Sequence, residues 1–266
     1  MRALLSGAAA GALAAASLRL LRAVPPGGPS VWERTNHAGR TVTLLEGPAY
    51  AVGATTAAAL LGAGPGPVLA TVGAAGWGAL DDLAGDHASK GLRGHLGALT
   101  RGEVTTGAVK VLGLALTGLV SAALVDRRSH GIRAVDTLAG GAVIAGTANL
   151  VNLLDLRPGR ALKVAAVLAV ALSGSAGSAA SAGAAAGAAL GVLGPDLAGQ
   201  SMLGDTGANS AGALLGAALV QRSGRRGRWG ALAVLTALTL ASERVSFTSV
   251  IESTPVLREL DALGRR

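Results

Sequence analysis

Two adjacent carboxylates stand at the end of an apolar segment. The segment begins near Pro67 and ends at Asp81 and Asp82, and Asp86 follows four residues after Asp82. On a helix, Asp82 and Asp86 would share a face, while Asp81 would point about 100° away. Ionisable groups at membrane depth cost several kcal/mol unless they face protein, water or a metal ion. The pair is therefore a candidate functional site; the alternative is that it only marks where the segment meets water.

A second polar motif, NLVNLLD, ends another apolar segment. Asn149 and Asn152 share a helix face, and Asp155 continues it. Amide groups deep in a membrane span need hydrogen-bond partners, and a nucleotide or a sugar supplies both donors and acceptors. The motif therefore predicts a binding site for such a ligand. Hydrogen bonding between neighbouring helices is the alternative.

A third motif, MLGDTGANS at 202–210, precedes a further apolar segment. Its Gly204-Asp205-Thr206-Gly207 core is typical of a flexible turn that presents one carboxylate and several backbone N–H groups at a helix N-terminus. Such a turn suits an anion and a bound cation together. The alternative is a simple loop in which Asp205 caps the helix.

We expect all three motifs on one face of a membrane, because two of them end their spans and the third precedes its own. Carboxylate oxygens without cysteine or a histidine cluster are ligands that Mg²⁺ or Mn²⁺ accepts. Basic residues follow the motifs, with Lys90 after the first and Arg157, Arg160 and Lys163 after the second. Carboxylates with a metal, and basic side chains around phosphates, are the parts that phosphoryl transfer needs.

The composition indicates an all-α polytopic membrane protein. Half of the 266 residues are apolar and only 14% are charged, whereas about a quarter are charged in soluble domains. The mean hydropathy is +0.51, and apolar runs long enough to cross a bilayer recur along the chain. The absence of cysteine excludes disulfides and thiolate chemistry. The net charge is +8, and the basic residues lie between the predicted spans. They form no basic stripe interleaved with aromatic residues, so no nucleic-acid partner is expected.

About nine transmembrane helices are predicted, and together they form one domain over residues 1–242. Their ranges are 3–22, 47–63, 66–81, 104–125, 132–154, 160–174, 177–194, 206–221 and 228–242. Residues 243–266 are predicted to form a cytoplasmic tail with one amphipathic helix. Ser253-Thr254-Pro255 predicts an N-cap with proline in the first helical turn, and Gly264 predicts the stop, with Val256, Leu260 and Leu263 on the apolar face.

The long polar connections, which carry the three motifs, are predicted to face the cytoplasm. The distribution of basic residues favours this orientation only slightly, and the cluster QRSGRRGR at 221–228 argues against it. We expect a multi-pass protein of the cell (inner or plasma) membrane with its active site on the cytoplasmic face.

The order of the motifs carries a family resemblance. A DD pair at a span end, then NxxNxxD, then GDTG resembles the polyprenyl-phosphate N-acetylhexosamine-1-phosphate transferases, which include the phospho-N-acetylmuramoyl-pentapeptide transferase of peptidoglycan synthesis. The segment ERTNHAGRTVTLLEG, from Glu33 to Gly47, is similar to that family's basic, histidine-containing first loop. The resemblance runs from about Arg34 to Leu215, and it lies in order and spacing rather than in one motif.

The resemblance implies an Mg²⁺-dependent enzyme of cell-envelope polymer synthesis, with Mn²⁺ as an alternative ion. It would transfer a sugar-1-phosphate from a UDP-linked amino sugar to a polyprenyl phosphate and release UMP. Asp81, Asp82 and Asp205 would be catalytic, with Asp205 and Asp82 as metal ligands. The implied substrate-binding residues are Asn149, Asn152, Asp155, Lys90, Arg157, Arg160, Lys163 and His37. Membrane lipids are further expected partners, and a homodimer is left open.

Two other functions remain open. The family carries a histidine cluster in its last cytoplasmic loop, and residues 243–266 contain no histidine. A catalytically inactive relative, binding lipid phosphate as a scaffold in envelope assembly, would explain this difference, although the intact set of aspartates argues against it. A transporter would account for the glycine-rich helices, but no internal repeat is evident and the polar groups cluster at one face.

Overall fold

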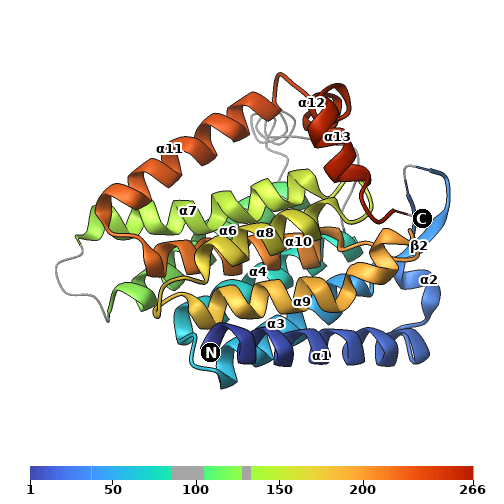
Figure 1. The fold of residues 1–266 in the computed structure, drawn as a ribbon, viewed down its shortest axis with the longest axis horizontal. Coiled ribbons are helices and arrows are strands. Elements are labelled where there is room, and N and C mark those ends of the chain that lie inside the picture. Colours follow the sequence, from blue (N-terminus) through green and yellow to red (C-terminus); the bar gives the residue numbers. More distant parts are fainter. Residues whose placement is uncertain (37, 85–104, 128–132, 266) are drawn as a thin grey trace.

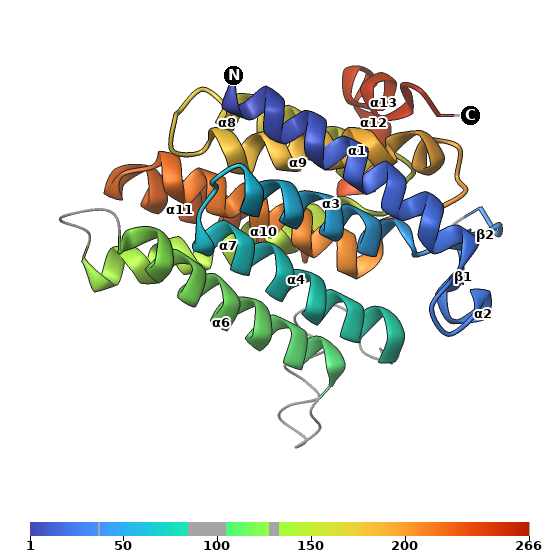
Figure 2. The same ribbon diagram turned by 90° about the horizontal axis from the view of Figure 1, so that it is seen from below.

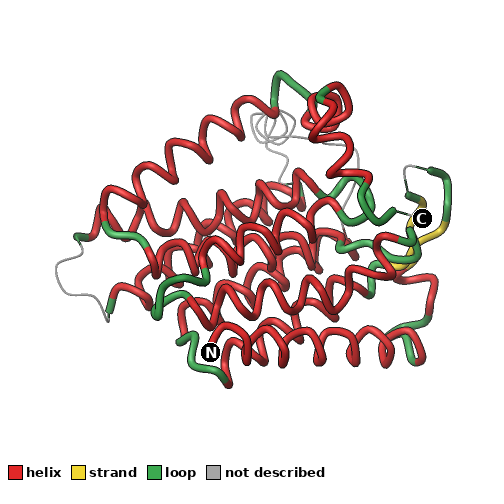
Figure 3. Tube along the Cα trace, in the orientation of Figure 1, coloured by secondary structure: helices red, strands yellow, loops and turns green. Residues whose placement is uncertain are grey.

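The computed structural model describes residues 1–36, 38–84, 105–127 and 133–265. These residues are mostly helical, which confirms the predicted all-α class (Figure 1, Figure 3). Each long helix overlaps one of the predicted apolar ranges. The long helices are α1 (Arg2–Ala23), α3 (Glu46–Leu60), α4 (Pro65–Ala84), α6 (Thr106–Asp126), α7 (Ala134–Leu154), α8 (Arg160–Leu172), α9 (Ala179–Leu197), α10 (Gly204–Arg222) and α11 (Arg225–Ser242).

The shorter elements gather at one end of the bundle (Figure 1). They are α2 (Pro29–Trp32), β1 (Glu33–Thr35), β2 (Thr41–Thr43), α12 (Phe247–Ser253) and α13 (Pro255–Ala262). The two strands form an antiparallel hairpin in which Glu33 pairs with Thr43. Thr43 also bridges to Ser201, and its carbonyl accepts the Met202 N–H at 3.1 Å. This contact ties the hairpin to the segment that leads into α10.

Helix α10 is the central helix of the bundle (Figure 2). It packs against α3, α4, α7, α8 and α9, and nearly every residue from Thr206 to Val220 is buried. Its sequence allows this because most of these residues are glycine or alanine, and small residues let neighbouring helices approach closely. The position of α10 bears on the candidate site, because the GDTG motif forms its first turn.

Helices α1 and α9 cross through glycines on both sides. Gly7 and Gly11 of α1 face Gly183, Gly187 and Gly191 of α9, which repeat every four residues. A Cβ atom at Gly187 would overlap the Gly7 carbonyl, and one at Gly191 would overlap the Gly11 carbonyl. The two backbones are therefore in direct contact along the crossing, which is a small-residue packing mode known from membrane helices.

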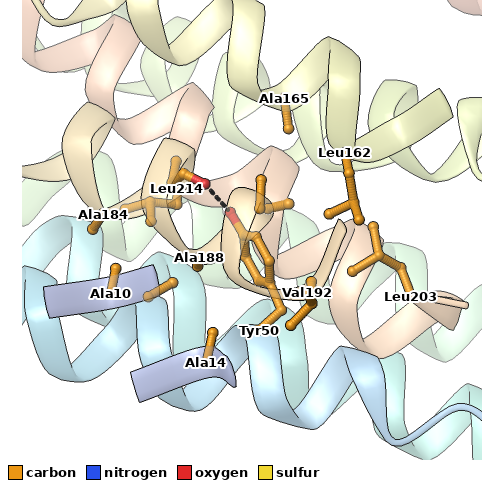
Figure 4. Packing of buried hydrophobic residues seen from close by; sticks show 14 of the residues in the cluster. Ala10, Ala14, Tyr50, Leu162, Ala165, Ala184, Ala188, Val192, Leu203 and Leu214 are labelled. Carbon is orange, nitrogen blue, oxygen red and sulfur yellow. Dashed lines mark hydrogen bonds between the residues drawn. The ribbon is translucent and has the colours of Figure 1, made fainter. Parts of the chain in front are cut away.

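The largest side chain in the alanine-rich core between these helices is that of Tyr50 in α3. It is fully buried beside Ala14, Ala188 and Val192 (Figure 4). Its hydroxyl donates a hydrogen bond to the Ala185 carbonyl at 3.3 Å. A buried phenol needs such a partner, and here the backbone of α9 supplies it.

Helix α11 diverges from the other long helices and packs on α7 (Figure 1). Only Arg228 and Leu235 of this helix are buried. Arg228 forms two hydrogen bonds to the Asp126 carboxylate, and the adjacent Trp229 donates to Asp136 at 3.0 Å. These contacts anchor the first turn of α11 to α6 and α7, and most of the remaining helix is exposed.

Within the described residues, three helices are long and apolar enough to cross a membrane: α1, α6 and α7. A fourth span results if α11 and α12, which meet at a bend of 89°, form one broken span. Helices α3 and α8 have 15 and 13 residues, fewer than the roughly 20 that a perpendicular span needs. The structure thus shows a mostly helical bundle with candidate membrane spans, and the number of nine spans stays a prediction.

Candidate functional site

The first and third motifs of the candidate site meet where α4 contacts the start of α10. Gly78, one helical turn before Asp82, lies against the backbone of Asp205 and Thr206. A Cβ atom at Gly78 would overlap the Asp205 carbonyl group. The missing side chain thus lets the acidic end of α4 reach the first turn of α10.

The Asp82 carboxylate stabilises the contact between α4 and α10. Its oxygens accept the backbone N–H groups of Asp205 at 3.0 Å and Thr206 at 2.8 Å, and the Thr206 hydroxyl at 2.6 Å. These N–H groups are the unpaired donors of a helix N-terminus, where a negative charge is favourable. Arg34 of the hairpin donates to the Asp82 carbonyl oxygen on the other side. Asp82 is therefore a positioning residue for the GDTG turn.

The other two aspartates meet at a lysine. The Nζ atom of Lys110 in α6 lies 2.6 Å from Asp81 Oδ2 and 2.6 Å from Asp205 Oδ2. Each of the three side chains is partly buried and keeps between 15% and 25% of its surface exposed. One ammonium group thus bridges two carboxylates from different helices, at a place that solvent or a ligand can still reach.

Lys110 is the main candidate site residue that the motifs alone did not identify. It is the one basic side chain inside the predicted span 104–125. An ionisable residue within an apolar segment is itself a functional-site candidate, and this signal was available in the sequence. What the sequence could not show is that Lys110 meets both Asp81 and Asp205.

The residues of this site fit a divalent cation in part. Mg²⁺ typically takes one or two carboxylates and completes its shell with water and substrate phosphates. Asp81 and Asp205 already share one cation, the Lys110 ammonium, so their oxygens converge on a common point. Asp82 is less suited, because its oxygens accept three hydrogen bonds from α10. Among the described residues, no group of three or more His, Cys, Asp or Glu side chains is placed to hold a metal.

The second motif lies at the end of α7, where Asp155 leaves the helix. Asn149 and Asn152 occupy its last turns, and neither side-chain amide has a hydrogen-bond partner among the described residues. Burial raises the pKa of Asp155 well above its usual range, and the neighbouring carboxylates of Asp196 and Asp205 raise it further. The hydrogen bond from the Gly204 N–H lowers the pKa of Asp155, but by less than these effects raise it. Asp155 thus lies next to the GDTG turn.

Asp155 also lines a cavity of about 650 Å³ at the same end of the bundle. This volume lies within the range of about 300–1,000 Å³ that small-molecule sites occupy. Arg40 of the hairpin loop, Arg157, Asp196, Ser201 and Arg265 also line it. The cavity therefore offers guanidinium, hydroxyl and carboxyl groups to one ligand, and its lining residue Asp155 is close enough to Asp205 for the two carboxyl groups to interact electrostatically.

Two buried acids near the cavity were not anticipated. Asp196, at the end of α9, is 2% exposed and accepts the Gly159 N–H at 3.0 Å. Burial raises its pKa to about 7. Glu46, at the start of α3, is fully buried and accepts a hydrogen bond from the Ser201 hydroxyl, while its Oε1 atom has no partner among the described residues. Both lack a sequence signal, because each is a lone acid at a helix end.

The basic residues after α7 have a different environment from the predicted one. Arg160 and Lys163 bind the C-terminal segment, and Arg157 pairs with Glu252 of α12 at 3.1 Å. Of the three, only Arg157 lines the cavity. Two further predicted substrate-binding residues, His37 and Lys90, lie outside the described residues, as does Asp86.

A comparison of the chain with protein-family models and with curated proteins finds no match.

Proposed function

We propose that the protein transfers a sugar-1-phosphate from a UDP-linked amino sugar to a polyprenyl phosphate and releases UMP. The observation that carries this proposal is the convergence of Asp81, Lys110 and Asp205, together with a cavity of nucleotide size whose lining residue Asp155 interacts electrostatically with Asp205. The order of the three polar motifs, which resembles the transferase family, supports the same function.

In the proposed reaction, a phosphate oxygen of the acceptor attacks the β-phosphorus of the donor. The bond from this phosphorus to the oxygen bridging the α-phosphorus breaks, and UMP leaves with the bonding electron pair. A phosphate monoester is largely dianionic at neutral pH, because its second pKa is about 6, so the attack needs no strong base. The main requirements are positioning and charge neutralisation, and Lys110 supplies one positive charge where the phosphates meet.

Asp205 and Asp81 would hold Mg²⁺ or Mn²⁺, which would neutralise charge on the donor diphosphate. We propose Asp81 as the second ligand in place of Asp82, because the Asp82 oxygens already accept three hydrogen bonds. Asp82 instead sets the position of Asp205, and Asn149, Asn152 and Asp155 contact the nucleotide.

The proposed setting is the cell membrane, crossed by the long helices with the site at the cytoplasmic surface. Large apolar side chains on the outside of the bundle support this placement, among them Leu112 and Leu116 of α6 and Val167 and Val170 of α8. The hairpin, the 155–159 connection, the GDTG turn and the C-terminal helices lie together at one end (Figure 1), where the polar substrates would arrive. In this proposal the chain crosses the membrane nine times, and α13 lies at the membrane surface.

The decisive experiment is UMP release by detergent-purified protein with polyprenyl phosphate, Mg²⁺ and a panel of UDP-amino sugars. We expect release from one donor that stops when lipid or metal is omitted. Asp205→Asn should abolish it, while Glu259→Gln, which removes an exposed charge on α13, should leave it unchanged. If folded protein releases no UMP from any donor, the transferase proposal is wrong. The alternative, a scaffold that binds lipid phosphate without turnover, then becomes the better account.

A further inference from the structure

The C-terminal segment, residues 246–265, is docked onto the connection that follows α7. We call this segment the tail. Asp261 of α13 accepts hydrogen bonds from Nε and Nη2 of Arg160, each at 2.8 Å. The Arg160 and Asp261 side chains are only 3% and 7% exposed. Arg265 adds a second guanidinium to the same carboxylate at 2.7 Å. A buried, bidentate arginine–carboxylate pair is among the strongest and most directional side-chain contacts.

Two further contacts complete the docking. The Lys163 ammonium donates to the carbonyls of Leu260, Asp261 and Leu263, at 3.0, 2.6 and 3.2 Å. These are carbonyls at the C-terminal end of α13, which lack helical partners and favour a positive charge. The remaining Arg160 Nη1 atom donates to the Thr248 hydroxyl at 2.8 Å. Arg160 and Lys163 therefore hold the tail, which leaves little of either group for substrate phosphate.

The docked tail forms one wall of the 650 Å³ cavity. Ser246, Thr248 and Arg265 of the tail line it together with Arg40 of the hairpin loop. Arg265 is held at this wall by Asp261 and by a hydrogen bond from its Nε atom to the Pro158 carbonyl at 3.0 Å. A guanidinium fixed in this way is suited to phosphate, and a hydroxyl to a ribose or a sugar.

We propose that Asp261 is a positioning residue for donor binding, because it fixes the tail as a cavity wall on which Arg265 and Thr248 contact the nucleotide part of the donor. This inference rests on the proposed transferase function. A wall that is already ordered reduces the entropy cost of binding. Loss of Asp261 should therefore weaken binding of the donor and leave the chemistry at Asp81, Lys110 and Asp205 intact.

The test uses full-length variants in the UMP-release assay. Asp261→Asn removes the charge that holds Arg160 and Arg265, and we expect the KM for the UDP-amino sugar to rise about 10- to 100-fold, the effect of losing a charged hydrogen bond. We expect kcat to change little. Asp261→Glu, which keeps the carboxylate, should recover part of the affinity. Glu259→Gln on the same helix is the matched control and should leave KM unchanged.

Arg265→Gln provides a second variant in case Asp261→Asn fails to fold. It removes the group at the cavity wall and keeps the Arg160–Asp261 pair, so we expect a raised KM with a normal unfolding temperature. Hydrogen exchange of the α13 amides reports separately whether the tail is docked. If Asp261→Asn frees these amides and KM does not change, or if Arg265→Gln leaves KM unchanged, the inference is wrong.

A failure of the transferase function itself is distinguishable. If the wild type releases no UMP, equilibrium binding of UMP decides the inference. Weaker UMP binding in Asp261→Asn and Arg265→Gln than in the wild type and in Glu259→Gln supports the tail as a cavity wall. Equal binding in all four proteins, or no binding to the wild type, overturns it.

Discussion

Gly78 of α4 lies so close to Asp205 at the start of α10 that a Cβ atom at position 78 would overlap the Asp205 carbonyl group. Four residues further along α4, Asp82 accepts the first backbone N–H groups of α10. The contact thus aligns Asp81 and Asp82 with the GDTG turn. A single absent side chain decides whether the site can form.

We therefore expect Gly78→Ala to destabilise the protein and to reduce UMP release strongly. Overpacking a close contact typically costs about 1–3 kcal/mol, and here it would also displace Asp205. The matched control is Gly76→Ala in the same helix, where nothing lies within 4 Å of the added methyl group. Thermal unfolding and UMP release should separate the two variants, and equal behaviour would contradict this account of the contact.

Lys110 should be essential for turnover. Lys110→Met leaves Asp81 and Asp205 facing each other without the ammonium between them, and removes a positive charge from the site of phosphate transfer. We expect UMP release to fall roughly 10²-fold or more, the usual effect of losing one electrostatic group in an active site. Arg226→Gln, which removes an exposed cation from the first turn of α11, is the charge control. Normal turnover in Lys110→Met would exclude Lys110 from the mechanism.

Substitutions of Asp81 and of Asp82 should cause different kinds of defect. In Asp82→Asn, one carboxylate oxygen becomes an NH₂ group that faces donors of Asp205 and Thr206, so we expect a loss of stability of about 1–3 kcal/mol. Asp81→Asn removes a charged partner of Lys110, whereas Asp81 accepts no backbone N–H of α10 among the described residues, so this variant should lose activity with little change in unfolding temperature. The two unfolding temperatures, measured side by side, check this. A larger destabilisation by Asp81→Asn would reverse the assignment.

The docking of the tail should depend on pH through Asp261. Burial acts to raise its pKa, but the hydrogen bonds from Arg160 and Arg265 outweigh this effect and lower the pKa below its usual value. The stabilisation is therefore complete above the unfolded-state pKa of about 3.9, and is lost as the pH falls through the lower folded-state value. We expect the difference in unfolding temperature between wild type and Asp261→Asn to be constant near neutral pH and to shrink below about pH 4. A difference that persists at lower pH would show that Asp261 acts without its charge.

The glycine crossing of α1 and α9 should be intolerant of a methyl group. Gly187→Ala places a Cβ against the Gly7 carbonyl, and we expect about 1–3 kcal/mol of destabilisation. Gly230→Ala in α11 has open space around its Cβ, and should be neutral or slightly stabilising because alanine favours a helix over glycine. Thermal unfolding of both variants in detergent measures the difference. If Gly230→Ala is the more harmful, the crossing does not depend on close backbone contact.

The ranges of the long helices could be predicted from the sequence, because apolar runs bounded by Gly, Pro and charged residues are a local signal. The same holds for the DD, NxxNxxD and GDTG motifs as candidate site residues, and for the start of the last helix after Thr254. Each of these features depends on residues within a few turns of one another.

The contacts between these elements were decided by tertiary structure alone. Lys110 is 29 residues from Asp81 and 95 from Asp205, and no periodicity shows which faces of α4, α6 and α10 meet. Arg160 and Lys163 have the charge of phosphate ligands in sequence, yet a carboxylate about 100 residues away binds one of them and the carbonyls of α13 bind the other. The physical reason is that a side chain's type depends on its own residue, whereas its partner depends on how closely the backbones pack, and in this chain glycines such as Gly78 set that distance.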